Sequence, residues 1–157
     1  MVNTAWKILK NVLIFLVTIL FWPIKAVFPA KLKVEHIKVP MKGISRKWTI
    51  VHLSDFHWDF KKNPRRITAK LMQQILDTTN SLDVDLILLT GDYVQYKPQP
   101  IHEFASEYLS KFKARYGTFA SLGNHDYKVQ GGNLIITQAL ETAGIKVLVN
   151  QFAKPLG

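Results

Sequence analysis

The sequence of 157 residues contains no cysteine. Disulfide frameworks and cysteine-based zinc sites are therefore excluded. Charged residues make up only 20% of the chain and hydrophobic residues 48%, a balance that excludes an intrinsically disordered protein. No internal repeat or low-complexity tract is present. The length is that of one domain.

Acidic side chains are scarce in the N-terminal part of the chain. Residues 1–66 carry 13 basic and 3 acidic side chains, a net charge of +10, whereas residues 67–157 carry 8 of each. A nucleic-acid-binding domain usually spreads its basic residues over its folded part, but here they flank an apolar stretch. We therefore expect an anionic lipid membrane as a partner, and no nucleic acid.

The apolar stretch covers residues 12–24 (VLIFLVTILFWPI). It is short for a transmembrane helix of roughly 20 residues. It can be extended to residue 30 if the Lys25 side chain reaches the membrane surface, although Pro23 and Pro29 would kink or end the helix. A signal peptide is the competing interpretation, but no small-residue cleavage site precedes the next lysines; a buried core helix is a weaker one. We predict an uncleaved membrane anchor over residues 1–30.

Positive charges flank this stretch unequally. Three precede it, counting the amino terminus, and seven follow it up to residue 47. Because the more positive flank stays in the cytoplasm, the downstream domain is predicted to face the cytoplasm. Residues 31–46 are then a basic juxtamembrane segment with a hairpin that turns at Lys42-Gly43.

From residue 47 onward the pattern is that of a globular domain. Apolar runs typical of buried strands cover residues 48–54, 86–90, 118–122 and 145–149. Helical patterns lie between them: one begins at Asn63-Pro64 and buries Ile67, Leu71 and Ile75, and the others cover residues 101–112 and 134–143. Strands that alternate with helices predict an α/β fold with a largely parallel sheet.

Polar residues follow three of these strands directly. The peptides are Ser54-Asp55-Phe56-His57, Gly91-Asp92 and Gly123-Asn124-His125-Asp126. Since the carboxyl ends of neighbouring parallel strands share one edge, the three loops are expected to meet in one crevice.

These residue types are metal ligands. We expect Asp55 and His57 to hold one ion, Asp92 to bridge it to a second, and Asn124 to bind the second. Two ions roughly 3.5–4 Å apart can clamp the attacking and leaving oxygens of a phosphoryl displacement. Mixed oxygen and nitrogen ligands suit manganese, iron or zinc better than calcium, and we expect manganese. Each motif alone is weak, since a Gly-Asp after a strand is usually a turn.

Together the motifs SDFH, TGDY and LGNHDY resemble the signature of the calcineurin-like metallophosphoesterases, which runs D-x-H, G-D-x-x, G-N-H-D/E. The resemblance implies the α/β/β/α sandwich of that family and the hydrolysis of a phosphorylated or pyrophosphate-containing substrate. It implies the metal ligands named above. It also implies that His125 contacts the phosphate and protonates the leaving oxygen, and that Asp126 orients His125.

The family pattern continues beyond this chain. It needs a further isolated histidine and a G-H-x-H motif, but no histidine follows Asp126. We therefore expect residues 47–157 to form the N-terminal half of the sandwich, a partial domain preceded by the apolar anchor helix. One sheet face would be left exposed, with poor stability as the result. We expect no hydrolysis by the 157-residue chain alone.

The substrate is a finer inference. The anchor, the basic segment and the run DVDLILLTGDYV resemble the membrane-associated bacterial UDP-2,3-diacylglucosamine pyrophosphatases of this type. This implies cleavage of a lipid A precursor at the cytoplasmic face of the bacterial inner membrane. Arg65 and Arg66 are candidate substrate contacts, because cations in a first helical turn favour a nearby anion, although a solvated basic face is the commoner explanation. Another membrane-anchored phosphodiesterase and a non-catalytic remnant are the alternatives.

Overall fold

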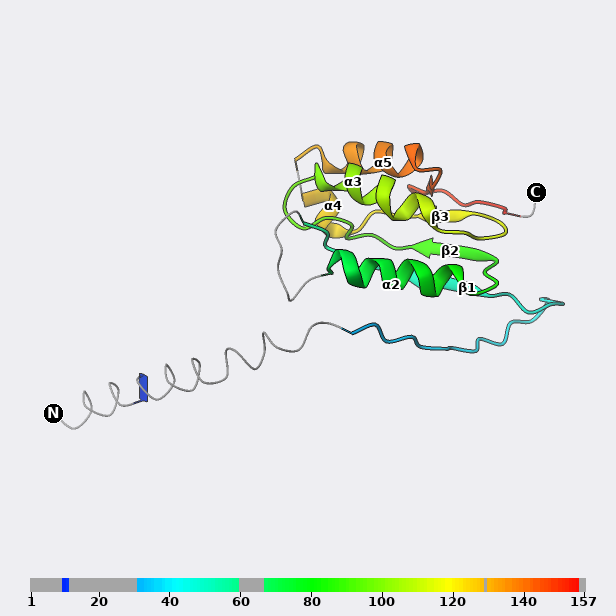
Figure 1. The fold of residues 1–157 in the computed structure, drawn as a ribbon. Coiled ribbons are helices and arrows are strands. Elements are labelled where there is room, and N and C mark those ends of the chain that lie inside the picture. Colours follow the sequence, from blue (N-terminus) through cyan, green and yellow to red (C-terminus); the bar gives the residue numbers. More distant parts are fainter. Residues whose placement is uncertain (1–9, 12–30, 60–66, 129, 156–157) are drawn as a thin grey trace. The chain divides into compact units, whose positions relative to one another are not determined.

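Four short strands form one parallel sheet in the order β1-β2-β3-β4 (Figure 1). They are β1 (Ile50–Leu53), β2 (Leu86–Leu89), β3 (Thr118–Ala120) and β4 (Lys146–Val147). All three pairings are parallel, and each strand lies beside the next one in the sequence. The α/β fold with a parallel sheet is therefore confirmed.

The computed structural model describes residues 10–11, 31–59, 67–128 and 130–155. Its helices are α2 (Ala69–Asn80), α3 (Pro100–Glu107), the 3-10 helix η1 (Leu109–Lys111), α4 (Asn124–Lys128) and α5 (Gly132–Thr142). The predicted helix over residues 101–112 is thus broken at Tyr108 into α3 and η1. The short helix α4, whose first three residues are all predicted site residues, was not predicted.

Helix α2 begins later than the sequence predicted. Its N-cap is Thr68, whose hydroxyl oxygen accepts the Leu71 amide at 3.2 Å. Neither Ile67 nor Thr68 is helical, so the helix does not run on from Asn63-Pro64. Its buried stripe is also displaced by one residue, because Met72 and Leu76 are buried while their predicted neighbours are only half-buried. The helix starts after Thr68 because the Thr68 side chain accepts a hydrogen bond from an amide that has no acceptor within the helix.

The two faces of the sheet differ in burial. On one face Ile87, Leu89 and Ala120 are buried. On the other, Leu88 and Phe119 lie opposite each other and are half-buried, while Ile50 on β1 is 49% exposed. Connections of the βαβ type are right-handed almost without exception and place successive helices on one side of a parallel sheet, so little helical cover is expected on the other side. Among these residues the second face is thus less buried than the first.

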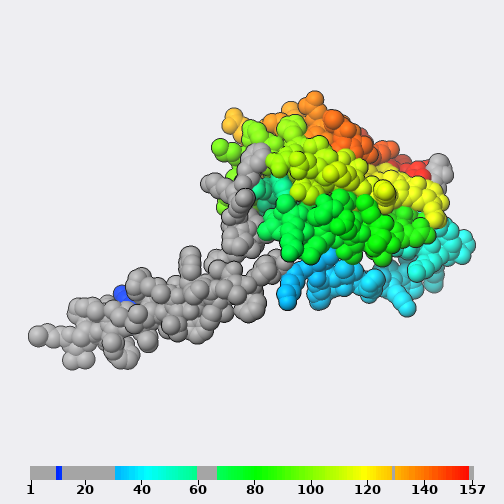
Figure 2. Space-filling view, in the orientation of Figure 1, coloured from blue at the N-terminus to red at the C-terminus, as the bar shows by residue number. Residues whose placement is uncertain are grey.

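Residues 31–47 contain neither helix nor strand and are exposed throughout; they lie at the surface, blue to cyan in Figure 2. The hairpin predicted in residues 31–46 is therefore not formed. The exposed side chains include six large apolar ones, which are Leu32, Val34, Ile37, Val39, Met41 and Ile44.

The end of this segment is attached to the sheet. The Arg46 guanidinium lies 3.9 Å from the centre of the Trp48 ring and donates to Asp85 Oδ1 at 3.1 Å. Asp85 Oδ2 accepts the Thr49 amide at 2.9 Å, and this bond lowers the pKa of the Asp85 carboxyl from its usual value. The cation and the amide thus hold one buried carboxylate in its charged form.

The predicted anchor over residues 1–30 lies outside the described residues, apart from Lys10 and Asn11. Within the residues that the structure describes, no helix has the length and apolarity needed to cross a bilayer.

Candidate metal site at the carboxyl ends of the strands

The loops that follow β1 and β2 run side by side. The Asp55 amide donates to Gly91 O at 3.1 Å, and the His57 amide to Asp92 O at 2.9 Å. The Trp58 amide donates to Tyr93 O at 2.8 Å, where a parallel bridge joins Trp58 to Val94. Both predicted motifs are therefore held in fixed register by their own backbone.

Buried aromatic side chains fix which way this loop faces. Phe56 and Trp58 are buried, with the Phe56 ring 5.1 Å and the Trp58 ring 4.9 Å from the ring of Phe104 on α3. These two rings are buried, whereas Asp55 is exposed and His57 is half-buried, so the loop directs Asp55 and His57 away from the core. The sequence analysis missed this support, although the alternation in DFHW indicates it.

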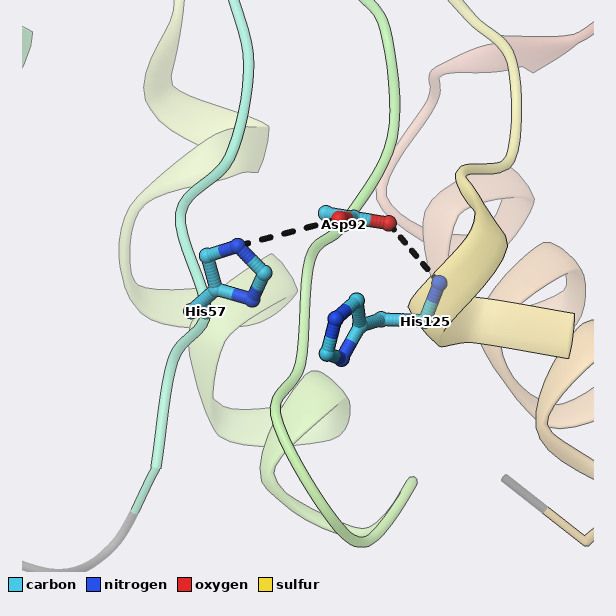
Figure 3. A group of neighbouring side chains, drawn as sticks. All are labelled: His57, Asp92 and His125. Atoms are coloured by element: carbon cyan, nitrogen blue, oxygen red, sulfur yellow. Dashed lines mark hydrogen bonds and ion pairs between the residues drawn. The ribbon is translucent and has the colours of Figure 1, made fainter. Parts of the chain in front are cut away.

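Three side chains converge, two from the loops after β1 and β2 and the third from the start of α4 (Figure 3). Ligand atoms of His57, Asp92 and His125 all lie within 4.8 Å of one another. His57 Nε2 is 3.7 Å from Asp92 Oδ2, and the other carboxylate oxygen, Oδ1, accepts the His125 amide at 2.9 Å. The expected meeting of the three loops is confirmed.

The other two predicted ligands, Asp55 and Asn124, are exposed. Asp55 is exposed, with Oδ1 at 3.6 Å from His57 Nε2, and its Oδ2 accepts the Ser54 hydroxyl at 2.6 Å. Asn124 is exposed and is the first residue of α4. The candidate substrate contacts Arg65 and Arg66 lie outside the described residues.

The backbone is strained at this site. Asp55, His57 and Asp92 have φ of 58°, 46° and 56°, and they are three of the four described non-glycine residues with positive φ. Such residues persist only where the surroundings impose the conformation, which costs of order 1–3 kcal/mol each. The folded chain therefore holds these three side chains in place against their local preference.

Asp126 makes contacts other than those the sequence predicted. It is fully buried. Its Oδ2 accepts the amides of Asp92 and Gly123, both at 2.8 Å, and its Oδ1 accepts the Tyr93 amide at 3.0 Å. These bonds do not reach the His125 ring, which Asp126 was predicted to orient. His125 Nδ1 lies 3.5 Å from the carbonyl oxygen of Gln95. Burial raises the pKa of the Asp126 carboxyl, and its bonds to the backbone amides oppose that shift.

Two glycines allow the loops after β2 and β3 to touch. A Cβ on Gly91 would lie 2.8 Å from the carbonyl carbon of Leu122 and closer still to the backbone of Gly123. A Cβ on Gly123 would in turn overlap the Asp92 carboxylate. Both glycines stand in the predicted motifs, but their spacing in the sequence does not reveal this contact.

The residues present fit a divalent metal ion. Among the described residues, His57 Nδ1 is the buried side-chain nitrogen or oxygen atom that has no hydrogen-bond partner. The group combines imidazole nitrogens with carboxylate oxygens, the donor types that zinc, manganese and iron accept. A bound cation would reduce the electrostatic repulsion between the Asp55 and Asp92 carboxylates, which both face His57.

The comparisons with known proteins point to one family. The calcineurin-like phosphoesterase family model matches residues 49–155. Phosphodiesterase YaeI of Escherichia coli K12 is 32% identical over 119 residues, which are 75% of this chain and 42% of that protein. UDP-2,3-diacylglucosamine pyrophosphatase LpxG of Chlamydia trachomatis is 35% identical over 78 residues, 50% of this chain and 22% of that protein.

An uncharacterized metallophosphoesterase of Campylobacter jejuni is 26% identical over 119 residues, 76% of this chain and 30% of that protein. The chain therefore spans less than half the length of these relatives. No solved structure matches it.

Proposed function

Because this chain belongs to the calcineurin-like phosphoesterase family, we propose that its site serves the metal-dependent hydrolysis of a phosphoester or pyrophosphate bond. The observation that carries the proposal is the convergence of His57, Asp92 and His125 from three loops, within 4.8 Å of one another. Strained backbone at two of these residues supports it further, since such strain gathers at functional sites.

The contacts of His57 and Asp92 support roles as metal ligands. Asp92 would be the ligand shared by the two ions; one of its oxygens accepts the His125 amide and the other faces His57. Asp55 and His57 would hold one ion, and Asn124 would hold a second. Two bound divalent ions, manganese by preference and iron or zinc otherwise, would polarise the phosphoryl group and lower the pKa of an attacking water.

His125 is the proton donor to the leaving oxygen. A carbonyl oxygen only accepts hydrogen bonds, so the Gln95 carbonyl favours the proton on His125 Nδ1. Nε2 is then the ring atom that gains and loses the catalytic proton. The Asp92 carboxylate accepts a hydrogen bond from the backbone amide of His125. This one contact therefore positions the His125 imidazole relative to Asp92.

The finer proposal is the substrate, the pyrophosphate UDP-2,3-diacylglucosamine, cleaved at the cytoplasmic face of a bacterial inner membrane. Support comes from the relative named as a pyrophosphatase for this compound. It also comes from residues 31–44, in which six exposed apolar side chains alternate with Lys31, Lys33, Lys38 and Lys42. Apolar side chains among lysines suit the surface of an anionic membrane, where an acylated substrate lies.

A second candidate is the hydrolysis of a phosphodiester. The relative named as a phosphodiesterase matches 75% of this chain, against 50% for the pyrophosphatase. The larger match favours the phosphodiester. It does not decide between the two substrates, because metal ligands determine the type of reaction and not the substrate.

The metal site is tested on the purified chain. Titration with Mn²⁺, followed by electron paramagnetic resonance, should show weak binding, because few protein ligands serve each ion. Asp92→Ala should abolish it. Asp77→Ala, an exposed aspartate of α2, is the matched control and should leave it unchanged. No binding at millimolar Mn²⁺, or equal loss in both variants, would contradict the proposal.

The reaction is tested in a chimaera in which residues 49–155 replace the matched region of the E. coli relative. Metal-dependent hydrolysis of bis(4-nitrophenyl) phosphate is expected, with loss on Asp92→Ala. For the substrate, Mn²⁺-dependent binding of UDP-2,3-diacylglucosamine to the full chain in phosphatidylglycerol vesicles is expected, and binding no stronger than that of UDP alone would favour the second candidate.

A further inference from the structure

The most completely buried polar group near the site is the carboxylate of Asp126, which is 0% exposed. It lies one residue beyond His125, but among the described residues no hydrogen bond joins its carboxylate to His125 or to another side chain. It accepts hydrogen bonds from the amides of Asp92, Tyr93 and Gly123. A buried carboxylate with no cation beside it is costly unless such bonds satisfy it, so its place demands an explanation.

We propose that Asp126 is a positioning residue, which holds the backbone of residues 92–93 and thereby fixes the direction of the Asp92 carboxylate. This inference rests on the proposed function, because Asp92 is the bridging ligand there. It assigns to Asp126 an action on the metal ligand rather than on the imidazole of His125.

The contacts between the two loops are reciprocal. The Asp126 side chain accepts from the Asp92 backbone at 2.8 Å, and the Asp92 side chain accepts from the His125 backbone at 2.9 Å. Each aspartate therefore anchors the main chain that carries the other. The closed pair of contacts leaves one Asp92 oxygen, Oδ2, directed toward His57 (Figure 3).

The backbone conformation explains why such a contact is needed. Asp92 has φ of 56°, in the left-handed region that non-glycine residues avoid. Its amide and that of Tyr93 are adjacent, and the two oxygens of one buried carboxylate accept both. Without this acceptor the peptide would be free to relax toward negative φ, and the Asp92 side chain would turn away from His57.

The third bond ties the arrangement to β3. Oδ2 of Asp126 also accepts the Gly123 amide, on the loop that Gly91 touches. The carboxylate thus joins the end of β2 to the loop after β3, across the line where the two backbones are in contact. Asp126 positions Asp92 relative to both neighbouring loops.

The amide of His125 reports directly on the position of Asp92. It lies in the first turn of α4, where amides have no acceptor within the helix. Its acceptor is Asp92 Oδ1, so its exchange with solvent is slowed only while that carboxylate is in place. The exchange rate of this amide proton, measured by NMR on the full chain without metal, is therefore the first readout.

The decisive variant is Asp126→Asn, which keeps the shape but places an NH₂ group against backbone amides that need an acceptor. We expect the His125 amide to exchange at least about tenfold faster than in the unsubstituted chain, approaching the rate in Asp92→Ala, and Mn²⁺ affinity to fall roughly 10–100-fold. The Ile87 amide, which donates to Gly117 O within the sheet, should change no more than in the control Leu140→Ala.

Leu140 is fully buried in α5, so Leu140→Ala lowers global stability without touching the site. Unchanged His125 exchange in Asp126→Asn, or equal acceleration at His125 and Ile87, would overturn the proposal and leave Asp126 a merely structural residue. If circular dichroism shows Asp126→Asn to be unfolded, Asp126→Glu, which retains the charge but displaces the oxygens, is judged by the same ratio of rates. If the unsubstituted chain binds no Mn²⁺, the proposed function fails, while the exchange rates still decide whether Asp126 positions Asp92.

Discussion

Gly91→Ala should be far more damaging than an ordinary glycine replacement. Gly91 has φ of +91°, and the added methyl would overlap the backbone of Gly123. Gly144 provides a matched control, because it also has positive φ, +79°, but has nothing within 4 Å of the Cβ position. The two variants therefore share the backbone strain and differ in the steric overlap.

The expected magnitudes follow from this difference. An L-residue in the left-handed region costs roughly 1–2 kcal/mol, and the lower entropy of the unfolded alanine chain offsets about 0.4–1 kcal/mol, so Gly144→Ala should cost about 1 kcal/mol. In Gly91→Ala the loops must also separate, which adds roughly 1–3 kcal/mol as overpacking does. Losing one hydrogen bond to the Asp126 carboxylate adds about 1.5–3 kcal/mol. The second variant should therefore be less stable than the first by at least about 2 kcal/mol.

Urea denaturation followed by tryptophan fluorescence measures both variants, with the chain kept in the same detergent. A domain has only about 5–15 kcal/mol of stability, and this sheet has an open face. The Gly91→Ala variant can therefore be unfolded even without urea. That result, together with a folded Gly144→Ala variant, also meets the expectation. Equal loss of stability in the two variants would refute the reasoning, since it would show that the loops after β2 and β3 do not touch.

Three further predictions concern catalysis, acid stability and the membrane. In the active chimaera, Asp92→Ala should abolish turnover and metal content together, while His125→Ala should lower kcat by roughly 10²–10⁴-fold and retain the metal; loss of metal in His125→Ala would reverse these roles. The pKa of Asp85 is lowered below 3.8 in the folded state, so its contribution to stability is present above pH 3.8 and is lost as the pH falls through the folded value. Asp85→Asn should remove this part of the acid sensitivity in urea titrations, and an unchanged pH profile would contradict it. The full chain should stay in the membrane fraction in high salt because apolar burial dominates, whereas deletion of residues 1–30 should leave at most a salt-extractable association; a full chain soluble without detergent would disprove the anchor.

Local patterns in the sequence were enough to predict the sheet. Each strand is a short apolar run bounded by turn residues, and each is separated from the next by a helical pattern, so the order of elements leaves little choice of topology. The boundaries were less well predicted. Thr68 and Asn63 are both good N-cap residues, and only the structure shows that α2 begins after Thr68.

The candidate site was likewise predicted only in part from the sequence. The positions of Asp55, His57, Asp92 and His125 after three strands are a property of the sequence, and parallel pairing alone brings their loops to one edge. The family resemblance implied that Asp126 orients His125, whereas the hydrogen bonds of its carboxylate go to backbone amides. Its side chain points into the protein, and which amides it meets there depends on the packing of two loops about 30 residues apart in the sequence.

By itself the sequence determined the residue types at the strand ends, the parallel order of the strands and the concentration of positive charge in residues 1–66, because each depends on composition and short-range pattern. Only the tertiary structure decided the left-handed backbone at Asp55, His57 and Asp92, the contact of Gly91 with Gly123 and the bonds of Asp126. These features depend on distances between segments that are remote in the chain, and strain is tolerated only where such contacts impose it. The chemistry of the ligands is therefore local, while the direction in which each ligand points is set by the packing of the three loops.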